Sequence, residues 1–232
     1  MTLDDFVAVN VYYDEAQRDV YKQILAEVGI SDIVELKVWR DDAKLDQECK
    51  LSLAQQVAIA VHEKPSVILG QMHYLSAFCY NDGKTDMVIF DSHNDSWGRS
   101  NNFNNGSFIN WRAGKTYVVG SDFTYTENDR LKIFSPREAD EILKERISDN
   151  VFLSLDIDVF SRTTTWAHHW VEERGSFSSL SPEQVATLSG KIIKNRKLLG
   201  VNIAEYDPNL ELPPYKTAKI ITDYLKVVMG II

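Results

Sequence analysis

The chain has 232 residues, 44% of them hydrophobic and 25% charged, which is typical of a globular protein with a substantial core. Its 34 acidic and 25 basic side chains give a formal charge of −9, which argues against non-specific binding to nucleic acid. Two cysteines are too few for a disulfide scaffold, and no apolar stretch approaches the roughly 20 residues that span a bilayer. We therefore expect a single domain, residues 1–232, in the reducing cytoplasm, with neither a membrane nor a nucleic-acid partner.

The first part of the chain alternates short strand-like runs with longer segments of helical period. In chain order we expect a strand over Phe6–Tyr13, a helix over Asp14–Val28, a strand over Val34–Trp39 and a helix over Leu45–His62. Gly29 follows the first helix and Pro65 the second, and both residue types are common just after a helix ends. Repeated strand-then-helix units predict an α/β fold.

Four further runs are almost continuously apolar: Ser66–Leu69, Met87–Phe90, Val151–Leu155 and Leu199–Ala204. Such runs suit strands of a parallel sheet that is covered by helices on both faces. Helices are expected to start at Ser135-Pro136 and at Ser181-Pro182, where Ser caps the helix and Pro takes its first position. A last helix begins near Pro214. The pattern predicts a mainly parallel sheet between helices.

Ligand-type side chains follow three of these runs, where each strand is expected to end. The motifs are Gly70-Gln-Met-His73, Asp91-Ser-His93-Asn-Asp95 and Asp156-Ile-Asp158. The carboxyl ends of parallel strands share one edge of the sheet, and side chains two residues apart lie on the same side of an extended chain. Four carboxylates and two imidazoles at one edge would repel each other strongly without a cation.

An isolated Asp-x-His-x-Asp is more often a loop or cap cluster than a metal site. Three ligand motifs at strand ends together nevertheless favour a metal centre. Carboxylate oxygens with some imidazole suit Mn²⁺ or a similar divalent ion, and four carboxylates can neutralise two such ions.

With Ser154-Leu-Asp156 and Ala204-Glu205-Tyr-Asp-Pro208, these motifs resemble those of the arginase or ureohydrolase superfamily in order and spacing. The superfamily pattern is Gly-Gly-x-His, Asp-Ala-His-x-Asp, Ser-x-Asp-x-Asp and Glu-x-Asn-Pro. The resemblance runs from about residue 66 to the C-terminus. It implies a three-layer α/β/α arginase-like fold with a mainly parallel sheet.

The resemblance also implies two Mn²⁺ ions per chain. One would be held by His73, Asp91, Asp95 and Asp156, and the other by Asp91, His93, Asp156 and Asp158. The ions would share a hydroxide, because a bound divalent ion lowers the pKa of water, and Asp95 would orient it. Glu205 would pair with a substrate guanidinium through both carboxylate oxygens.

Three departures from enzymes that act on free arginine point to a different substrate. Asn105-Gly106 stands where those enzymes carry His-Gly as a proton shuttle, and an amide cannot transfer protons at neutral pH. The third motif continues as Val159-Phe-Ser-Arg162 instead of reaching a further Asp-Pro, and the loop that grips the head of free arginine is not recognisable in Ser96–Asn110. In these respects the chain resembles the peptide arginases, which convert arginine to ornithine within a precursor peptide of a ribosomally made natural product.

Two loops carry the remaining candidate residues. His168 and His169, after the metal aspartates, are candidate catalytic residues that would shuttle a proton or contact substrate. The alternative is a surface loop whose aromatic side chains pack inward. Asn105 and Trp97 are candidate substrate contacts, although Trp97 equally suits the core.

The sequence leaves three other functions open. One is a ureohydrolase acting on free arginine, agmatine or formiminoglutamate. Another is a zinc-dependent deacetylase-like amidohydrolase, whose single metal needs two Asp and one His. The third is a catalytically silent metal-binding protein. Retention of all six manganese-type ligands and of Glu205 favours a guanidino hydrolase whose partner is an arginine-containing precursor peptide or a small guanidino substrate. A homo-oligomer is compatible with the sequence.

Overall fold

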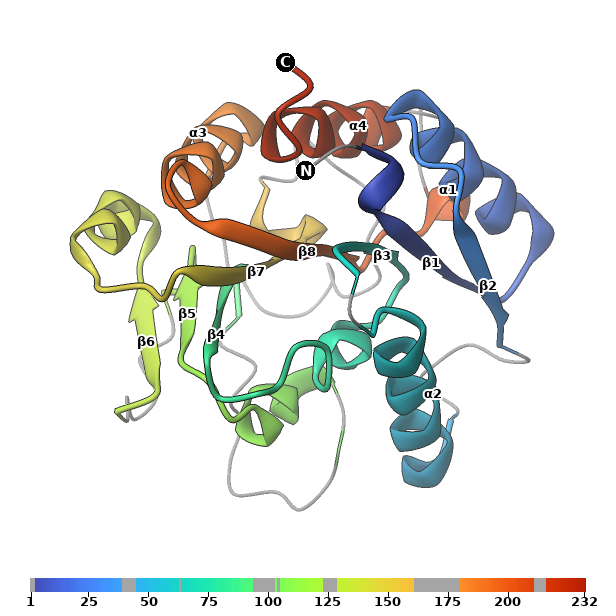
Figure 1. Ribbon diagram of the computed structural model, residues 1–232, viewed down its shortest axis with the longest axis horizontal. Coiled ribbons are helices and arrows are strands. Elements are labelled where there is room, and N and C mark those ends of the chain that lie inside the picture. The colour runs from blue at the N-terminus through green and yellow to red at the C-terminus, as the bar shows by residue number, and fades with distance from the viewer. Residues whose placement is uncertain are drawn as a thin grey trace.

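Eight strands form one sheet in the order β2-β1-β3-β8-β7-β4-β5-β6, and every neighbouring pair is parallel (Figure 1). The computed structural model describes residues 3–38, 45–62, 64–93, 103, 105–122, 129–160, 180–210 and 216–232. Within them the strands are β1 (Val7–Tyr12), β2 (Ile33–Lys37), β3 (Ser66–Leu69), β4 (Thr85–Phe90), β5 (Thr116–Val119), β6 (Leu131–Phe134), β7 (Asn150–Asp156) and β8 (Lys197–Ala204). The parallel sheet predicted from the apolar runs is confirmed.

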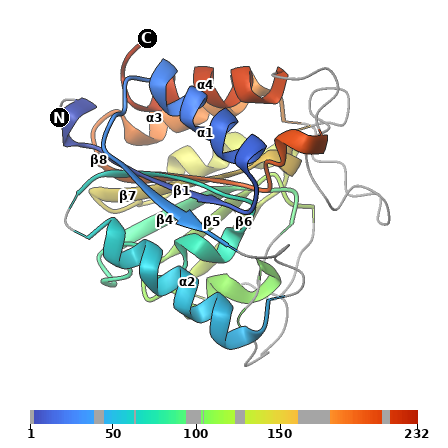
Figure 2. The ribbon, with the colours of Figure 1, turned by 90° about the vertical axis from the view of Figure 1, so that its right-hand side faces the viewer.

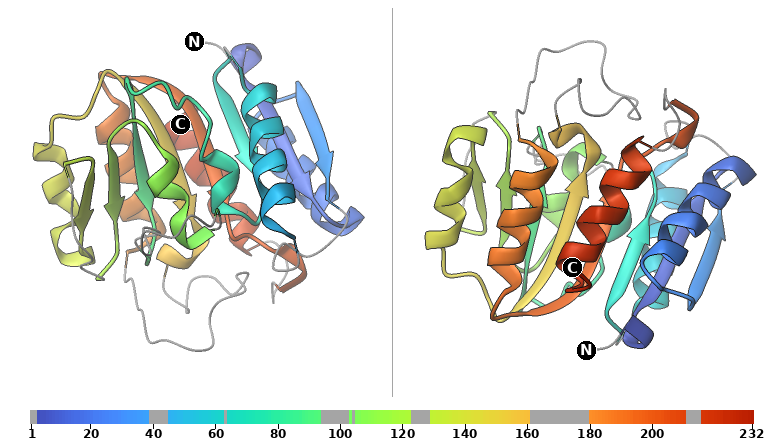
Figure 3. Two further views of the ribbon diagram at one scale, coloured as in Figure 1. Left: turned by 90° about the horizontal axis from the view of Figure 1, so that it is seen from below. Right: turned by 90° about the horizontal axis from the view of Figure 1, so that it is seen from above.

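Helices cover both faces of the sheet, so the predicted three-layer α/β/α architecture is also confirmed (Figures 2 and 3). One face carries α1 (Glu15–Glu27), α3 (Pro182–Ile193), α4 (Lys216–Val228) and the 3-10 helix η5 (Pro136–Lys144). The other carries α2 (Gln47–Ala60) and the 3-10 helices η3 (His73–Ser76) and η4 (Asn105–Trp111). Three shorter 3-10 helices are η1 (Leu3–Asp5), η6 (Ile157–Val159) and η7 (Pro208–Leu210).

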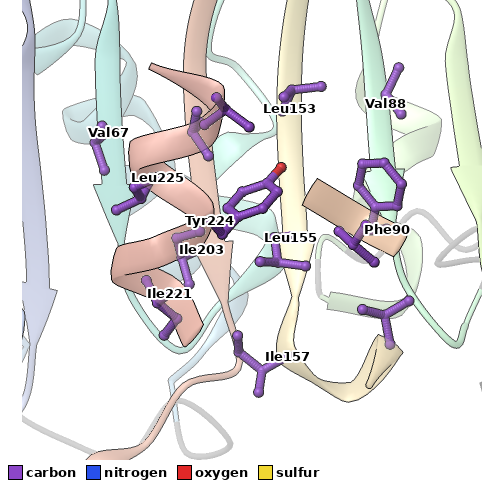
Figure 4. Packing of buried hydrophobic residues seen from close by; sticks show 14 of the residues in the cluster. Val67, Val88, Phe90, Leu153, Leu155, Ile157, Ile203, Ile221, Tyr224 and Leu225 are labelled. Carbon is purple, nitrogen blue, oxygen red and sulfur yellow. The ribbon is translucent and has the colours of Figure 1, made fainter. Parts of the chain in front are cut away.

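Side chains of the central strands alternate between two hydrophobic cores. In β4, Val88 and Phe90 point to the core under α1, α3 and α4, whereas Met87 and Ile89 point to the core under α2. Figure 4 shows the first of these cores, with α4 laid across the strands. Each large apolar side chain buried in this way stabilises the fold by roughly 1.5–3 kcal/mol, so both layers hold the sheet in place.

Short polar side chains set the starts of the α-helices. Asp14 and Asp46 each accept a hydrogen bond, 2.8 Å long, from the backbone N–H three residues further on. Ser181 and Gln184 form a reciprocal capping box at the start of α3. The predicted helices over residues 14–28 and 45–62 are confirmed, as α1 and α2.

The helix expected at Ser135-Pro136 is a 3-10 helix, η5, and not an α-helix like α3. The Ser135 hydroxyl donates to the Glu138 carboxylate at 2.8 Å and so does not cap a backbone N–H.

Sequence analysis did not identify β5 and β6, which have only four residues each. Trp39, the expected last residue of a strand, and Pro214, the expected start of the last helix, lie outside the described residues. No helix in the described part of the chain is long and apolar enough to cross a membrane.

Gly200 lies where β8 passes closely between its neighbours β3 and β7. A Cβ at this position would come within 2.8 Å of the Ser66 carbonyl oxygen and 3.0 Å of the Phe152 ring. We expect Gly200→Ala to lower the free energy of unfolding by about 1–3 kcal/mol, because the paired strands cannot separate to admit a methyl group.

Gly190→Ala in α3 is the matched control for this substitution. Its Cβ would make an ordinary contact with Val227 at 3.8 Å, and the higher helix propensity of Ala should raise the free energy of unfolding by about 0.5–1 kcal/mol. Chemical denaturation measures both variants. Equal stability of the two variants would contradict the packing argument for Gly200.

Candidate metal centre

Four adjacent strands bring acidic and histidine side chains to the carboxyl edge of the sheet. In sheet order these strands are β3, β8, β7 and β4. After β3 comes His73, the first residue of η3, and Glu205 follows β8. Asp156 is the last residue of β7, and Asp158 lies just beyond it in η6. Asp91 and His93 follow β4. The structure therefore brings together the residues predicted from the three strand-end motifs, as far as it describes them, and adds Glu205 to them.

The first cluster consists of His73, Asp156 and Glu205. One potential ligand atom from each lies within 4.8 Å of the others. His73 Nε2 is hydrogen-bonded to Asp156 Oδ2 and lies 3.7 Å from Glu205 Oε1. His73 and Asp156 are each 1% exposed and Glu205 is 9% exposed, so the cluster is almost closed to water.

The second cluster consists of Asp91, His93 and Asp158, again with one potential ligand atom each within 4.8 Å of the others. His93 Nδ1 lies 2.7 Å from Asp158 Oδ2 and 3.6 Å from Asp91 Oδ1. The other oxygen of Asp91 lies 3.8 Å from His73 Nδ1 in the first cluster. Asp91 thus faces both clusters, which suits the bridging role that the family resemblance implied.

Local hydrogen bonds fix the orientation of these carboxylates. The backbone N–H groups of His93 and Asp158 donate to Asp91 Oδ1 and Asp156 Oδ1, at 2.6 and 2.8 Å. Ser92 donates to Asp158 through its N–H at 3.1 Å and its hydroxyl at 2.6 Å. In both motifs the first Asp therefore accepts from the backbone N–H two residues on. Asp158 lies in the 3-10 helix η6, so the extended chain that the sequence analysis assumed ends at Asp156. The contribution of Ser92 was not anticipated.

Burial makes the negative charge at this edge unfavourable without a cation. Burial, followed by the neighbouring Asp158 and Asp91 charges, raises the pKa of Asp156 well above its usual value. Burial and the charge of Asp156 likewise raise the pKa of Glu205 well above its usual value. The Glu205 Oε2 atom has no hydrogen-bond partner among the described residues. A bound divalent cation would coordinate buried oxygen atoms that lack hydrogen-bond donors and would offset their charge.

In the second cluster the ion pair between His93 and Asp158 offsets part of the buried negative charge. Although burial acts to lower the pKa of His93, hydrogen bonds and the charges of Asp158 and Asp91 raise it to about 12. Burial acts to raise the pKa of Asp158, but His93 and Ser92 lower it to about 2. The protonated His93 ring therefore occupies the charge position that a metal would take. Both clusters fit a divalent ion with oxygen and imidazole ligands.

Residues that sequence analysis missed hold the first cluster in position. The ring of Phe108 in η4 packs against His73, with centroids 5.7 Å apart. Arg112 is 3% exposed, and its Nη1 donates to the carbonyl oxygens of residues 76, 77 and 79. The Ser76 hydroxyl in turn donates to the His73 carbonyl at 2.9 Å. Burial lowers the pKa of Arg112 to about 10, so it remains charged at neutral pH.

Glu205 is held in an uncommon backbone conformation. Its φ is +59°, in the left-handed region that costs a non-glycine residue free energy unless its surroundings fix it. Its N–H donates to the Gln71 carbonyl at 3.2 Å, and the Tyr21 hydroxyl donates to the next carbonyl, that of Tyr206, at 2.6 Å. These contacts aim the carboxylate at His73. No sequence signal marked Tyr21 as part of this support.

Several predicted residues remain untested. Asp95, Trp97, His168 and His169 lie outside the described residues, and so do most of the two loops that carry them. Asn105 begins η4, but its side chain is not described. Their assignment to metal, catalysis or substrate stays a prediction.

Comparisons with known proteins agree with this geometry. The Arginase family matches residues 11–230 of the chain. A search of curated protein sequences found no match. Among solved structures, the chain is similar to a hypothetical agmatinase from Burkholderia thailandensis, with 15% identity, a TM-score of 0.72 and coverage of 98% of this chain and 86% of the other.

Two further solved structures share the fold. The agmatine ureohydrolase of Thermoplasma volcanium has 16% identity and a TM-score of 0.71, covering 98% of this chain and 89% of that one. Arginase from Bacillus subtilis has 16% identity and a TM-score of 0.70, covering 98% and 99%. At these identities the structural likeness concerns the fold alone.

The metal-free protein is expected to lose stability as the pH rises from about 6 to about 8. The raised pKa of His93 gives stability that is full below the ordinary His pKa of about 6.5 and is lost as the pH rises through the folded value of about 12. The raised pKa values of Asp156 and Glu205 act in the same direction wherever the pH lies between their unfolded and their folded values, because over that interval the folded protein holds a proton that the unfolded chain has released. Each such proton lowers the free energy of unfolding by about 1.4 kcal/mol per pH unit.

Thermal denaturation over a pH series, in chelator and in excess Mn²⁺, measures this dependence. Metal should raise the melting temperature and should remove or reverse the pH trend, because the ion competes with protons for the same ligands. A metal-free melting temperature that increases between pH 6 and pH 8 would contradict the charge assignment.

Proposed function

The chain belongs to the arginase family, and we propose that it is a manganese-dependent hydrolase that converts an arginine within a precursor peptide to ornithine with release of urea. The observation that carries this proposal is the position of Glu205. Its buried carboxylate lies beside His73 and Asp156 at the carboxyl edge of the sheet, 3.7 Å from the His73 ring. A carboxylate next to a metal cluster is positioned to hold a planar cation against it.

Two divalent ions would be held by the described ligands His73, Asp91, His93, Asp156 and Asp158, together with Asp95. Such ions supply a water molecule whose pKa is low enough to act as a nucleophile near neutral pH. The oxygen-rich donor set with two imidazoles, and no thiolate, suits Mn²⁺. A deacetylase-like enzyme with one zinc would need only two Asp and one His, so the second cluster argues against that alternative.

Glu205 would recognise the guanidinium. When a cation is bound beside it, the carboxylate ionises and can accept two parallel hydrogen bonds from the planar group. This bidentate contact would fix the guanidinium carbon in front of the nucleophile and disfavours an ammonium, which cannot present two parallel N–H groups from separate nitrogens.

The reaction is a hydrolysis in which atoms balance without a further reactant. Water adds to the guanidinium carbon, the bond from that carbon to the ornithine nitrogen breaks, and the leaving nitrogen takes a proton. Asp95 is the candidate to orient the water, and His168 or His169 to deliver the proton in place of the shuttle that Asn105 lacks.

The peptide substrate is supported by what the chain changes relative to enzymes of free arginine. The metal ligands and Glu205 are present, whereas Asn105, Val159-Phe-Ser-Arg162 and the stretch over residues 96–110 depart from the pattern that binds a free amino-acid head. A side-chain guanidinium presented by a peptide does not need that head-binding loop. Trp97 is the candidate to contact the peptide.

Asp156→Asn tests the metal centre. The substitution keeps the shape of the side chain but removes a charge that faces His73, so urea release should fall by at least about 100-fold and Mn²⁺ affinity should fall with it. Metal analysis after loading and a urea assay measure the two effects. Asp19→Asn, at an exposed carboxylate paired with Arg18, is the control and should behave like the unchanged protein. Less than one bound ion per chain of the unchanged protein would overturn the two-metal proposal.

A substrate panel tests the peptide assignment. We expect the Mn²⁺ form to convert arginine to ornithine in an arginine-containing peptide more efficiently than it hydrolyses free arginine, agmatine or formiminoglutamate. Glu205→Gln should lower kcat/KM for the peptide by about 10–100-fold through loss of a charge-assisted contact. Preference for a free compound would replace the peptide proposal, whereas turnover of acetyl-lysine with zinc alone would reject guanidino hydrolysis. If Glu205→Gln lost bound metal as well as activity, Glu205 would be a metal ligand and not the residue that binds the guanidinium.

A further inference from the structure

A second charged site lies at the opposite edge of the sheet, where β4, β5, β6 and β7 begin. A pocket of about 650 Å³ is formed there by the loops that precede these strands. Its charged lining residues are Lys84, Lys115, Arg130, Arg146, Asp86 and Asp149. We propose that this pocket binds a small anion bearing a phosphate group.

The charge of the pocket is opposite to that of the chain. Its four basic and two acidic lining residues give 4 − 2 = +2, whereas the whole chain carries −9. Lys84, Lys115 and Arg146 form no ion pair with any residue that the structure describes. By contrast, Lys132, two residues after Arg130, pairs with Glu145 at 2.7 Å. These three cations without an ion pair, gathered in one pocket, favour an anionic ligand.

The sheet itself places two of these cations side by side. Thr116 and Leu131 are register partners in β5 and β6, and Lys115 and Arg130 precede them directly. The carbonyls of Lys115 and Arg130 accept ladder hydrogen bonds from Met87 and Thr116, at 2.9 and 2.7 Å. The ladder therefore fixes where the Lys115 backbone enters the pocket, directly beside that of Arg130.

The remaining wall of the pocket is also fixed. Ser148 donates its N–H to Asp86 Oδ2 at 2.8 Å, and the Asp86 N–H donates to the Ser148 hydroxyl at 3.1 Å. These two hydrogen bonds join the loop that carries Arg146 to the start of β4. They also hold the side chain of Asp86, one of the two acidic residues that line the pocket. A Cβ at Gly114 would lie 2.2 Å from the Thr85 carbonyl oxygen, so the loop before β5 packs directly on β4. The pocket is therefore built on sheet-anchored loops.

The ligand chemistry follows from the donors. Ammonium groups from Lys84 and Lys115 and guanidinium groups from Arg130 and Arg146 come from four different loops. The three terminal oxygens of a phosphate can accept from several directions at once, whereas a carboxylate offers two oxygens in one plane. The excess of basic over acidic lining residues suits an anion. The site is separate from the metal centre, because the six residues of β4 place the two edges about 20 Å apart.

Titration of the full chain with inorganic phosphate and, separately, with pyrophosphate tests the proposal. In ¹H–¹⁵N correlation spectra at constant ionic strength, we expect saturable shifts for residues 83–86, 113–116 and 146–150, and none at residues 91–93 and 156–158. The double substitution Lys115→Gln/Arg146→Gln should weaken binding by about 100-fold, as two charge-assisted contacts are lost. This readout does not depend on hydrolytic activity, so the proposal can fail or stand independently of the proposed function.

Lys197→Gln is the matched control for the charge change. Lys197 is exposed and begins β8 at the same edge of the sheet, but it does not line the pocket. The control should bind both anions like the unchanged chain. Shifts confined to the metal-site residues, equal weakening in the control and the double variant, or no saturation by either anion would each overturn the proposal.

Discussion

Buried negative charge at the carboxyl edge of the sheet is the constraint on which the site depends. Asp91, Asp156 and Glu205 are withdrawn from water, so burial, together with the charge of the neighbouring Asp158, raises the pKa of each. Residues of this kind are tolerated in a core only when protons or cations neutralise them. Protein stability, proton uptake and metal binding are therefore linked at this edge, and His93 shows the linkage directly because its ring pairs with Asp158 where a cation would bind.

The parallel sheet explains how so many charges come to one place. Strands β3, β8, β7 and β4 are neighbours although they are far apart along the chain. A residue of the candidate site ends β7 and follows within a few residues of the end of each of the other three. Rigid supports then keep the ligands aimed inward: Phe108 and Arg112 hold the segment of His73, and Tyr21 holds the segment of Glu205. The left-handed backbone at Glu205 is strain that these contacts maintain at the site where substrate recognition is proposed.

The two edges of the sheet carry opposite charge. Carboxylates gather where the strands end, and basic side chains gather where β4 to β7 begin. A net charge of −9 conceals this division. The two edges lie about 20 Å apart, roughly two Debye lengths in physiological salt, so each edge attracts its own ligand with little influence from the other. One fold can thus present a cation-binding site and an anion-binding pocket.

The sequence by itself determined the α/β class and the α1 and α2 helices and indicated the candidate ligand residues, because apolar periodicity, capping residues and motif spacing are local properties. It also placed His73, Asp91 and Asp156 at one edge, since parallel strands share their carboxyl ends. Only the tertiary structure decided how these ligands divide into clusters, that Glu205 reaches His73, and that Arg112 and Tyr21 support them. These relations join strands and loops that are distant in the chain, and so do the loops of the basic pocket. No local pattern records the strand order that brings them together.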